Sequence, residues 1–199
     1  MGLLLVVSSP SGCGKTTVVN KILKKSKDFN RSVSYTTRPR QNGEINGQDY
    51  NFLTEKRFKH LIKKSFFIEW ANVHGYLYGT SKKQLLKCIN GRKDTFYVID
   101  VIGGLRLKKI LPHSILIFLA PPKIRDLNKR IEKRKRENKE EIKKRLKRAV
   151  FEFEKAKRYD YLVINDDVNK TVALVEDIVK VEKYKSKRNL DKISALIKR

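Results

Sequence analysis

The 199-residue chain is long enough for one substantial hydrophobic core with a small inserted subdomain, and 40% of its residues are hydrophobic. It carries 47 Lys and Arg against 21 Asp and Glu, a net charge of +26, which indicates either an anionic partner or a lysine-biased solvated surface. Two cysteines exclude a disulfide framework, and the lack of a long apolar stretch or signal-peptide pattern predicts a cytoplasmic protein without a membrane partner.

Short apolar segments alternate along the chain with helical patterns. Strands are expected at residues 3–8, 96–100, 114–120 and 161–165, and helices at 14–26, 103–110, within 123–159 and at 170–184. This alternation predicts an α/β fold with a parallel sheet. Residues 34–82 break the rhythm, because they are polar and aromatic with turn sequences, and they predict an inserted subdomain with its own short strands and helices.

Residues 8–17, SSPSGCGKTT, follow the first apolar segment and precede a helical pattern, and we call them the phosphate loop. They match the motif G-x-x-x-x-G-K-[ST] except that Ser9 replaces its first glycine. A strand, a glycine-rich turn and a helix N-terminus together direct backbone N–H groups at phosphate oxygens. The alternative is a chance turn with a surface lysine. The residues expected to bind ATP here are Ser9, Pro10, Ser11, Gly12, Cys13, Gly14, Lys15, Thr16 and Thr17.

Within the loop, Lys15 is expected to reach the β- and γ-phosphates, and the Thr16 hydroxyl is expected to bind Mg²⁺. Gly12 and Gly14 allow the backbone to bend around the phosphates. Cys13 is expected to be a small filling residue rather than a redox switch, because no resolving partner is near it in the sequence.

The inserted region contains groups that suit a second anion and a polar ligand. Arginines and tyrosine hydroxyls bind phosphate, and the segment SVSYTTRPR supplies Arg38 and Arg40. Glu69 lies among apolar and aromatic residues in FFIEWANVHG. A carboxylate is costly there unless a partner meets it, although a surface ion pair is the simpler reading of this residue alone.

Six motifs occur in the order and nearly the spacing of guanylate kinases: SPSGCGKTT, SVSYTTR, GQDYNF, FIEWANVHGYLYGTS, LAPP and INDD. The chain resembles that family over residues 3–184. The resemblance implies a P-loop NTPase-type fold, in which a parallel sheet is flanked by helices. It also implies an enzyme that transfers the γ-phosphoryl group of Mg²⁺-bound ATP to GMP. It implies a core at 1–33, 83–122 and 148–184, a GMP-binding subdomain at 34–82, a helical lid at 123–147 and a basic C-terminal tail at 185–199.

The resemblance also implies how GMP is recognised. Glu69 would accept the ring N1–H and the amine of guanine, while Ser34 and Thr80 would donate to its carbonyl oxygen. Adenine would leave these polar groups unpaired and be rejected. The ligands implied for the GMP phosphate are Arg38, Tyr50 and Tyr78. Arg40 does not match the family position, and it is expected to reach the same phosphate through an adjustment of its loop.

The sequence departs from the family pattern at several places. Gln41 stands where the family has its second arginine, and Arg40 comes one residue early. Val98 and Ile102 replace an acidic residue and a glutamine of the family. Asp100 remains, at the end of a predicted strand, where it is expected to support Mg²⁺ or its waters and to belong to the GMP site.

The resemblance assigns lid and adenine-side residues as well. Arg130, Arg134 and Arg145 align with lid arginines, and Asn165 in INDD aligns with the adenine-side residue. Catalysis by Lys15, Arg38, Arg134 and Arg145 would then consist of positioning and charge neutralisation, with lid closure excluding water. Each arginine could instead be a solvated residue on a basic helix, and Asn165 a turn residue.

Three other functions are compatible with parts of the sequence. One is a related P-loop kinase with another phosphorylated acceptor, which the predicted guanine-reading residues argue against. Another is a non-catalytic guanylate-kinase-like binding module, which Lys15, Thr16 and the three lid arginines argue against. Nucleic-acid binding rests only on the charge, without a recognisable motif, and weak salt-sensitive binding would follow from charge alone. The sequence does not indicate an oligomeric state.

Overall fold

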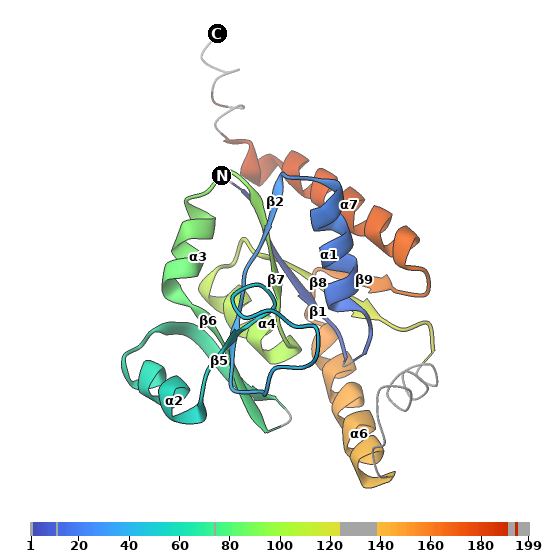
Figure 1. The fold of residues 1–199 in the computed structure, drawn as a ribbon. Helices are drawn as coiled ribbons and strands as arrows, with labels where there is room; N and C mark the ends of the chain where they lie inside the picture. Colours follow the sequence, from blue (N-terminus) through green and yellow to red (C-terminus); the bar gives the residue numbers. More distant parts are fainter. Residues whose placement is uncertain (1, 11, 74, 124–138, 191–193, 195–199) are drawn as a thin grey trace.

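The computed structural model of the protein describes residues 2–10, 12–73, 75–123, 139–190 and 194. Its central sheet has five parallel strands in the order β2-β7-β1-β8-β9, so β1 lies in the middle (Figure 1). The predicted α/β fold with a parallel sheet is confirmed. The strands are β1 (Leu4–Ser8), β2 (Phe29–Arg31), β7 (Asp94–Val98), β8 (Ile115–Ala120) and β9 (Tyr161–Ile164).

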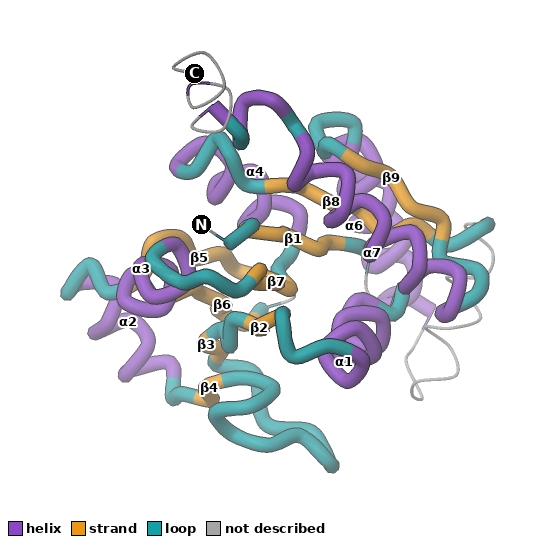
Figure 2. Tube along the Cα trace, turned by 90° about the horizontal axis from the view of Figure 1, so that it is seen from above, coloured by secondary structure: helices purple, strands orange, loops and turns teal. Residues whose placement is uncertain are grey.

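Helices cover both faces of this sheet, as Figure 2 shows from above. Residues of α1 and α7 pack against one face in a single hydrophobic cluster, and residues of α3 and α4 pack against the other. Successive strand residues enter opposite clusters, as Val6 and Val7 do in β1. The helices are α1 (Lys15–Lys25), α3 (Lys82–Ile89), α4 (Val101–Ile110), α6 (Lys139–Ala156) and α7 (Val168–Tyr184).

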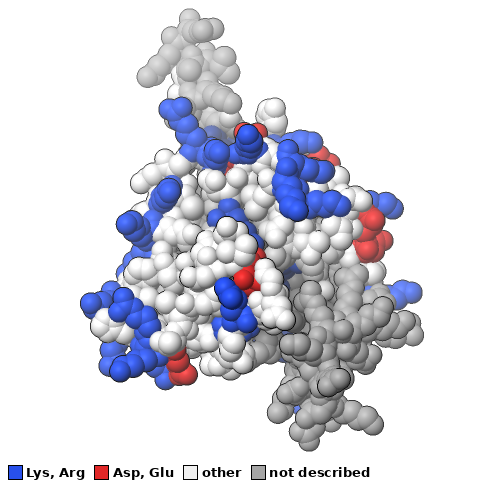
Figure 3. Space-filling view, in the orientation of Figure 1, with Lys and Arg blue, Asp and Glu red and all other residues white. Residues whose placement is uncertain are grey.

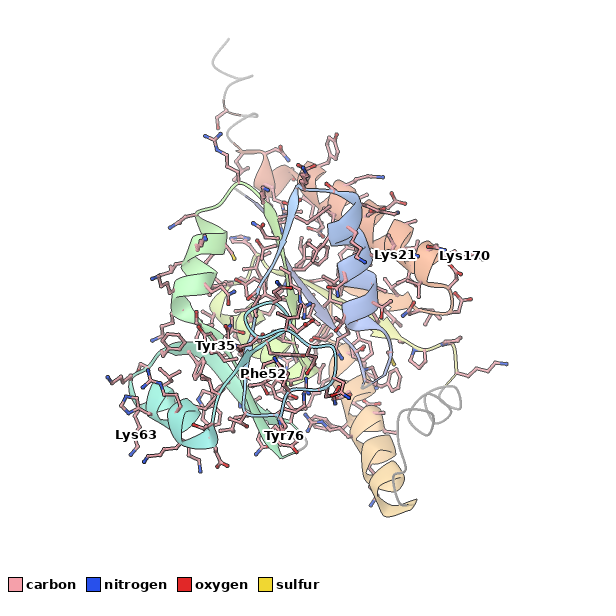
Figure 4. The ribbon with its side chains drawn as sticks, viewed as in Figure 1. Lys21, Tyr35, Phe52, Lys63, Tyr76 and Lys170 are labelled. Carbon is pink, nitrogen blue, oxygen red and sulfur yellow. The ribbon has the colours of Figure 1, made fainter. Side chains whose placement is uncertain are left out.

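The predicted insertion of short strands and helices is present as a second sheet of four strands in the order β4-β3-β6-β5. Helix α2 packs on it through Phe58, whose ring stacks on Phe67 with centroids 4.4 Å apart. Figure 4 shows Tyr35, Phe52 and Tyr76 in this region, well separated from Lys21 and Lys170 on α1 and α7. The elements are β3 (Tyr35–Thr36), β4 (Asn51–Phe52), α2 (Glu55–Lys63), β5 (Phe67–Val73) and β6 (Tyr76–Ser81).

The chain beyond α7 is tied to the core as far as a short 3-10 helix, η1 (Ser186–Arg188). Glu182 is 2% exposed and accepts hydrogen bonds from Tyr161 at 2.6 Å and Lys185 at 2.5 Å. Arg188 donates to the backbone oxygen of His113 at 2.9 Å. The start of the basic tail is therefore held by specific contacts rather than being only a solvated end.

The charge of the chain is displayed mainly on surface helices. In Figure 3, Lys and Arg side chains gather over α2 and over the upper part of α1, and few acidic side chains are visible on that face. Long basic side chains commonly extend from helices into water in this way. Within the described residues, no helix is both long and apolar enough to cross a bilayer.

Candidate active site

The turn between β1 and α1 has the backbone geometry of an anion-binding loop. Gly12 and Gly14 have positive φ angles of 87° and 82°, which cost other residues about 1 kcal/mol or more. Helix α1 begins at Lys15, directly after this turn. The N–H groups of the first helical turn and the positive dipole end of the helix therefore face the loop. This arrangement is suited to phosphate oxygens.

Ser9 takes the place of the first glycine of the motif, and its geometry explains why a serine fits. Its φ angle is not positive, so the backbone does not require glycine there. The ammonium group of Lys15 donates to the carbonyl oxygen of Ser9 at 2.8 Å and to its hydroxyl at 3.1 Å. The same hydroxyl donates to the carbonyl oxygen of Pro10 at 2.8 Å. Ser9 thus helps to hold the lysine in the loop.

Asn165 follows β9, and its side chain forms a hydrogen bond with the backbone of the phosphate loop. It is 2% exposed, and its amide nitrogen donates to the carbonyl oxygen of Cys13 at 2.7 Å, while its amide oxygen accepts from Thr171 at 2.9 Å. A Cβ atom on Gly14 would lie 2.8 Å from the Asn165 nitrogen, so Gly14 is required by space as well as by φ. Asn165 therefore fixes the loop, and its contact with adenine stays a prediction.

Three buried polar residues, Glu69, Thr80 and Ser34, form a site that we call the Glu69 pocket. Glu69 and Thr80 face each other on antiparallel β5 and β6, and Thr80 Oγ1 donates to Glu69 Oε1 at 2.7 Å. All three residues are buried, with exposed fractions of 7%, 0% and 6%. Glu69, which the sequence places among apolar and aromatic residues, is therefore buried, and its carboxylate is met by a hydroxyl partner.

The ionisation of Glu69 reflects this burial. Removal from water raises the pKa of Glu69 to about 7, although the hydrogen bond from Thr80 opposes the rise. The negative charge of Asp100 raises it further, and Arg106 lowers it. A ligand that donated N–H groups to this carboxylate would stabilise its charged form. The Glu69 pocket is therefore suited to a base edge that carries hydrogen-bond donors.

A second cluster, which we call the Arg38 cluster, consists of Arg38, Glu44, Tyr50 and Tyr78. Arg38 Nη2 lies 2.5 Å from Glu44 Oε1, and its guanidinium lies 5.4 Å from the centre of the Tyr50 ring. The Tyr50 and Tyr78 rings meet edge to face with centroids 5.9 Å apart. Arg40 is exposed on the adjoining loop. The structure thus brings three of the four predicted phosphate ligands together, and Arg40 as a ligand stays a prediction.

Glu44 is a residue of this cluster that the sequence analysis did not single out. One carboxylate oxygen binds Arg38, and the other accepts the backbone N–H of Gln41 at 2.7 Å. Glu44 therefore closes the loop and orients the guanidinium. The contact uses only the backbone of Gln41, so the loss of the family arginine at that position leaves it intact. The available signal was an acidic residue, Glu44, only four positions after Arg40 in the sequence RQNGE.

Asp100 is a predicted site residue, but its position in the backbone differs from the prediction. Strand β7 ends at Val98, so Asp100 lies beyond the strand and caps α4 by accepting N–H bonds from Ile102 at 2.9 Å and Gly103 at 3.3 Å. A Cβ atom on Gly103 would lie 3.0 Å from Glu69 Oε2 and 3.2 Å from Asp100 Oδ2. Both carboxylates therefore approach the same glycine.

Residues of the phosphate loop, the Glu69 pocket and the Arg38 cluster line one cavity of about 190 Å³. The core sheet, the second sheet and helix α6 all contribute to its wall. The charged and hydroxyl side chains that face it include Ser9, Lys15, Glu69, Tyr78, Asp100 and Glu152. Glu152 was not predicted as a site residue. The phosphate loop and the Glu69 pocket therefore open into one shared space.

Several predicted residues are not placed in this cavity. Ser11, Arg130 and Arg134 lie outside the described residues, as does most of the predicted lid, and for Arg145 only its place in α6 is described. Thr16 and Thr17 are exposed in the first turn of α1. The lid contacts therefore stay predictions.

The fold and the site together define a nucleotide-binding protein of the P-loop class, with a second polar pocket beside the phosphate loop. A family model described as Guanylate kinase matches residues 1–182. A guanylate kinase of Caldanaerobacter subterraneus subsp. tengcongensis is 42% identical over 190 residues, which cover 96% of this chain and 92% of that protein. One of Thermotoga maritima is 41% identical, with coverage of 96% and 93%.

The solved structures include a similar fold. The crystal structure of guanylate kinase from Anaplasma phagocytophilum superposes with a TM-score of 0.81 at 33% sequence identity, and the match covers 96% of this chain and 93% of that one. The chain described here belongs to the guanylate kinase family.

Proposed function

We propose that the protein transfers the γ-phosphoryl group of ATP to GMP and so forms ADP and GDP. The observation that carries this proposal is the shared cavity, into which Lys15 projects from the phosphate loop and Glu69 from the second sheet. A lysine for phosphate and a buried carboxylate for a base edge then face one reaction space. Membership of the guanylate kinase family supports the same reaction.

GMP would occupy the side of the cavity formed by the second sheet. The Glu69 carboxylate would accept the N1–H and amine of guanine, and Ser34 would donate to its carbonyl oxygen. Thr80 already donates to Glu69 and so orients it. The Arg38 cluster would bind the GMP phosphate, because arginine and tyrosine hydroxyls both donate to phosphate oxygens. Residues 34–82 would then form the GMP-binding subdomain.

ATP would occupy the phosphate loop. Backbone N–H groups of the loop and of the first turn of α1 would hold its phosphates, and Lys15 would exchange its bonds to Ser9 for bonds to phosphate oxygens. Because the transferred group is already electrophilic, the protein needs chiefly to align it with the GMP oxygen and to neutralise charge. Arg134 and Arg145 in the lid would complete that neutralisation.

The residues present suit a magnesium ion that accompanies ATP. Thr16 supplies a hydroxyl at the start of α1, and Asp100 supplies a carboxylate at the cavity. Mg²⁺ that accompanies a nucleotide commonly binds phosphate and water ligands beside one or two protein groups. The ion would neutralise phosphate charge. We place the reaction in the cytoplasm.

The proposal is tested by the acceptor that ADP formation requires. Purified protein with Mg²⁺ and ATP is expected to form ADP with GMP and far more slowly with AMP, UMP or no acceptor, because the Glu69 pocket rejects other base edges. dGMP belongs in the same panel. Folded protein that forms no ADP with any acceptor would overturn the proposal, and GMP binding without turnover would instead indicate a binding module.

A further inference from the structure

Helix α6 turns one face toward the core, and a carboxylate interrupts that face. Ala149 packs with Cys13 of the phosphate loop, and Phe153 meets Phe118 with ring centroids 5.7 Å apart. Glu152 and Phe153 lie three and four residues after Ala149, and these spacings place each of them beside Ala149 on the helix surface. Glu152 is only 5% exposed. An apolar contact surface therefore contains one buried charged group, directly beside the cavity.

Glu152 has cations around it at the place where phosphates are expected. It lines the cavity together with Lys15 and Asp100, and the Nε of Arg148 donates to its Oε1 at 3.3 Å. Burial raises the pKa of Glu152, whereas the charges of Lys15 and Arg148 lower it and Asp100 raises it. The carboxylate thus binds an arginine of α6 and interacts electrostatically with the lysine of the phosphate loop.

Stability of the fold does not account for this arrangement. Burying a carboxylate is unfavourable, and an apolar side chain of similar volume is often equally stabilising or better in such a position. An Arg-Glu pair four residues apart on a helix contributes little by itself. The described contacts of Glu152 are explained better by what it does to its two cationic neighbours.

We propose that Glu152 is a positioning residue for phosphoryl transfer, which orients Lys15 and Arg148 toward the phosphates of the two nucleotides. This inference rests on the proposed function. Glu152 acts through the two cations and does not itself contact the reacting atoms. Since Glu152 and Ala149 both lie on α6, the helix that also carries Arg145, the same contact would align the end of the lid with the phosphate loop.

The test compares Glu152→Gln with Glu154→Gln, a control on the same helix whose exposed carboxylate binds only Lys157 among its described partners. For Glu152→Gln we expect kcat to fall at least tenfold, because small misplacements of reacting groups have large effects on rate. The KM for GMP should stay within twofold, because the Glu69 pocket is unchanged. The thermal midpoint should not fall. Glu154→Gln should match the wild type in each measurement.

A second variant separates positioning from structure. Arg148→Met should also lower kcat, and the double variant Arg148→Met Glu152→Gln should be no slower than the slower single variant if the two act as one unit. Full kcat in Glu152→Gln would overturn the inference, as would a loss of activity that parallels a lower thermal midpoint. Wild-type protein without GMP-dependent ADP formation would instead contradict the proposed function, so the two failures are distinguishable.

Discussion

The phosphate loop and the Glu69 pocket share one cavity but are built in opposite ways. The loop presents backbone N–H groups, and its form depends on the φ angles of Gly12 and Gly14. The Glu69 pocket presents side-chain oxygens, and its form depends on burying Glu69 against Thr80. A backbone site tolerates a changed side chain wherever φ is ordinary. A site made of side chains binds its ligand more weakly when one polar atom is replaced, because the partner of that atom is then left unpaired.

The two regions also differ in how they carry charge. The helix end of the loop carries a fixed partial positive charge that does not titrate. The carboxylate of Glu69 has a pKa of about 7, because burial opposes its charge. Proton concentration should therefore act on the GMP side through Glu69. Substitutions and pH together can separate the two regions.

The largest effect is expected for Lys15→Met. Removing a cation that stabilises developing phosphate charge should lower kcat by about 10²–10³-fold. Lys24→Met is the matched control, because it removes one exposed lysine from the same helix. Steady-state ADP formation measures both variants. A Lys15→Met rate within tenfold of the wild type would show that the loop does not act as described.

The second-largest effect is expected for Gly14→Ala, which strains the backbone of the phosphate loop and removes no polar side chain. The new Cβ atom would meet the Asn165 nitrogen at 2.8 Å in a residue with φ of 82°, so we expect ATP affinity to fall by about 10-fold or more, as strain of 1–3 kcal/mol implies. At Gly75 the φ angle is a similar 83°, and among the described residues beyond its chain neighbours no atom lies within 4 Å of the Cβ that Gly75→Ala would add. Calorimetry of ATP binding should find Gly75→Ala unchanged, and equal losses in both would argue against the spatial role of Gly14.

A change of pH should act on the Glu69 pocket with a defined sign. With a pKa of about 7, most Glu69 side chains bind a proton at pH 6, and guanine would have to displace it. GMP affinity is expected to fall by about tenfold from pH 8 to pH 6. The GMP phosphate titrates near pH 6 too, so Glu69→Gln serves as the control, and its dependence should be clearly weaker. Identical pH profiles would remove Glu69 from the recognition of guanine.

Ser9→Gly is expected to have the smallest effect. The Ser9 carbonyl can still accept from Lys15 after the hydroxyl is lost, and the backbone at position 9 has no positive φ angle to protect. The KM for ATP should change by about fivefold or less, since one exchangeable hydrogen bond contributes about 1 kcal/mol or less. A tenfold change would show that the hydroxyl is needed to place the lysine.

The sequence predicted the elements whose signals are local. Strand β1 is a continuous apolar segment directly before a glycine turn, and both features are visible within about fifteen residues. Strand β2 was missed, because three residues, FNR, give no periodicity. Strand β7 was expected two residues too late, because the apolar run continues past Val98 to Ile99, which is buried outside the strand.

Roles that depend on distant partners were less accessible. Asn165 bonds to the carbonyl of Cys13, 152 positions away in sequence, and nothing local to either residue indicates that pair. Glu152 reads from the sequence as one member of a charged helix, and only packing of α6 against the phosphate loop shows that it is buried. The motif and the family resemblance therefore predicted the residues of the phosphate loop and of the Glu69 pocket. The residues that support these sites, Asn165 and Glu152, could be recognised only from the fold.

The most direct single measurement is kcat/KM for GMP in Glu69→Gln, beside the KM for ATP in the same variant. If a side-chain carboxylate reads guanine while a backbone loop holds ATP, kcat/KM for GMP should fall by about 10²-fold, because hydrogen bonds to a charged group each contribute about 1.5–3 kcal/mol. The KM for ATP should stay within twofold. A variant that keeps wild-type kcat/KM for GMP, or that loses ATP and GMP affinity equally, would contradict this division of the site.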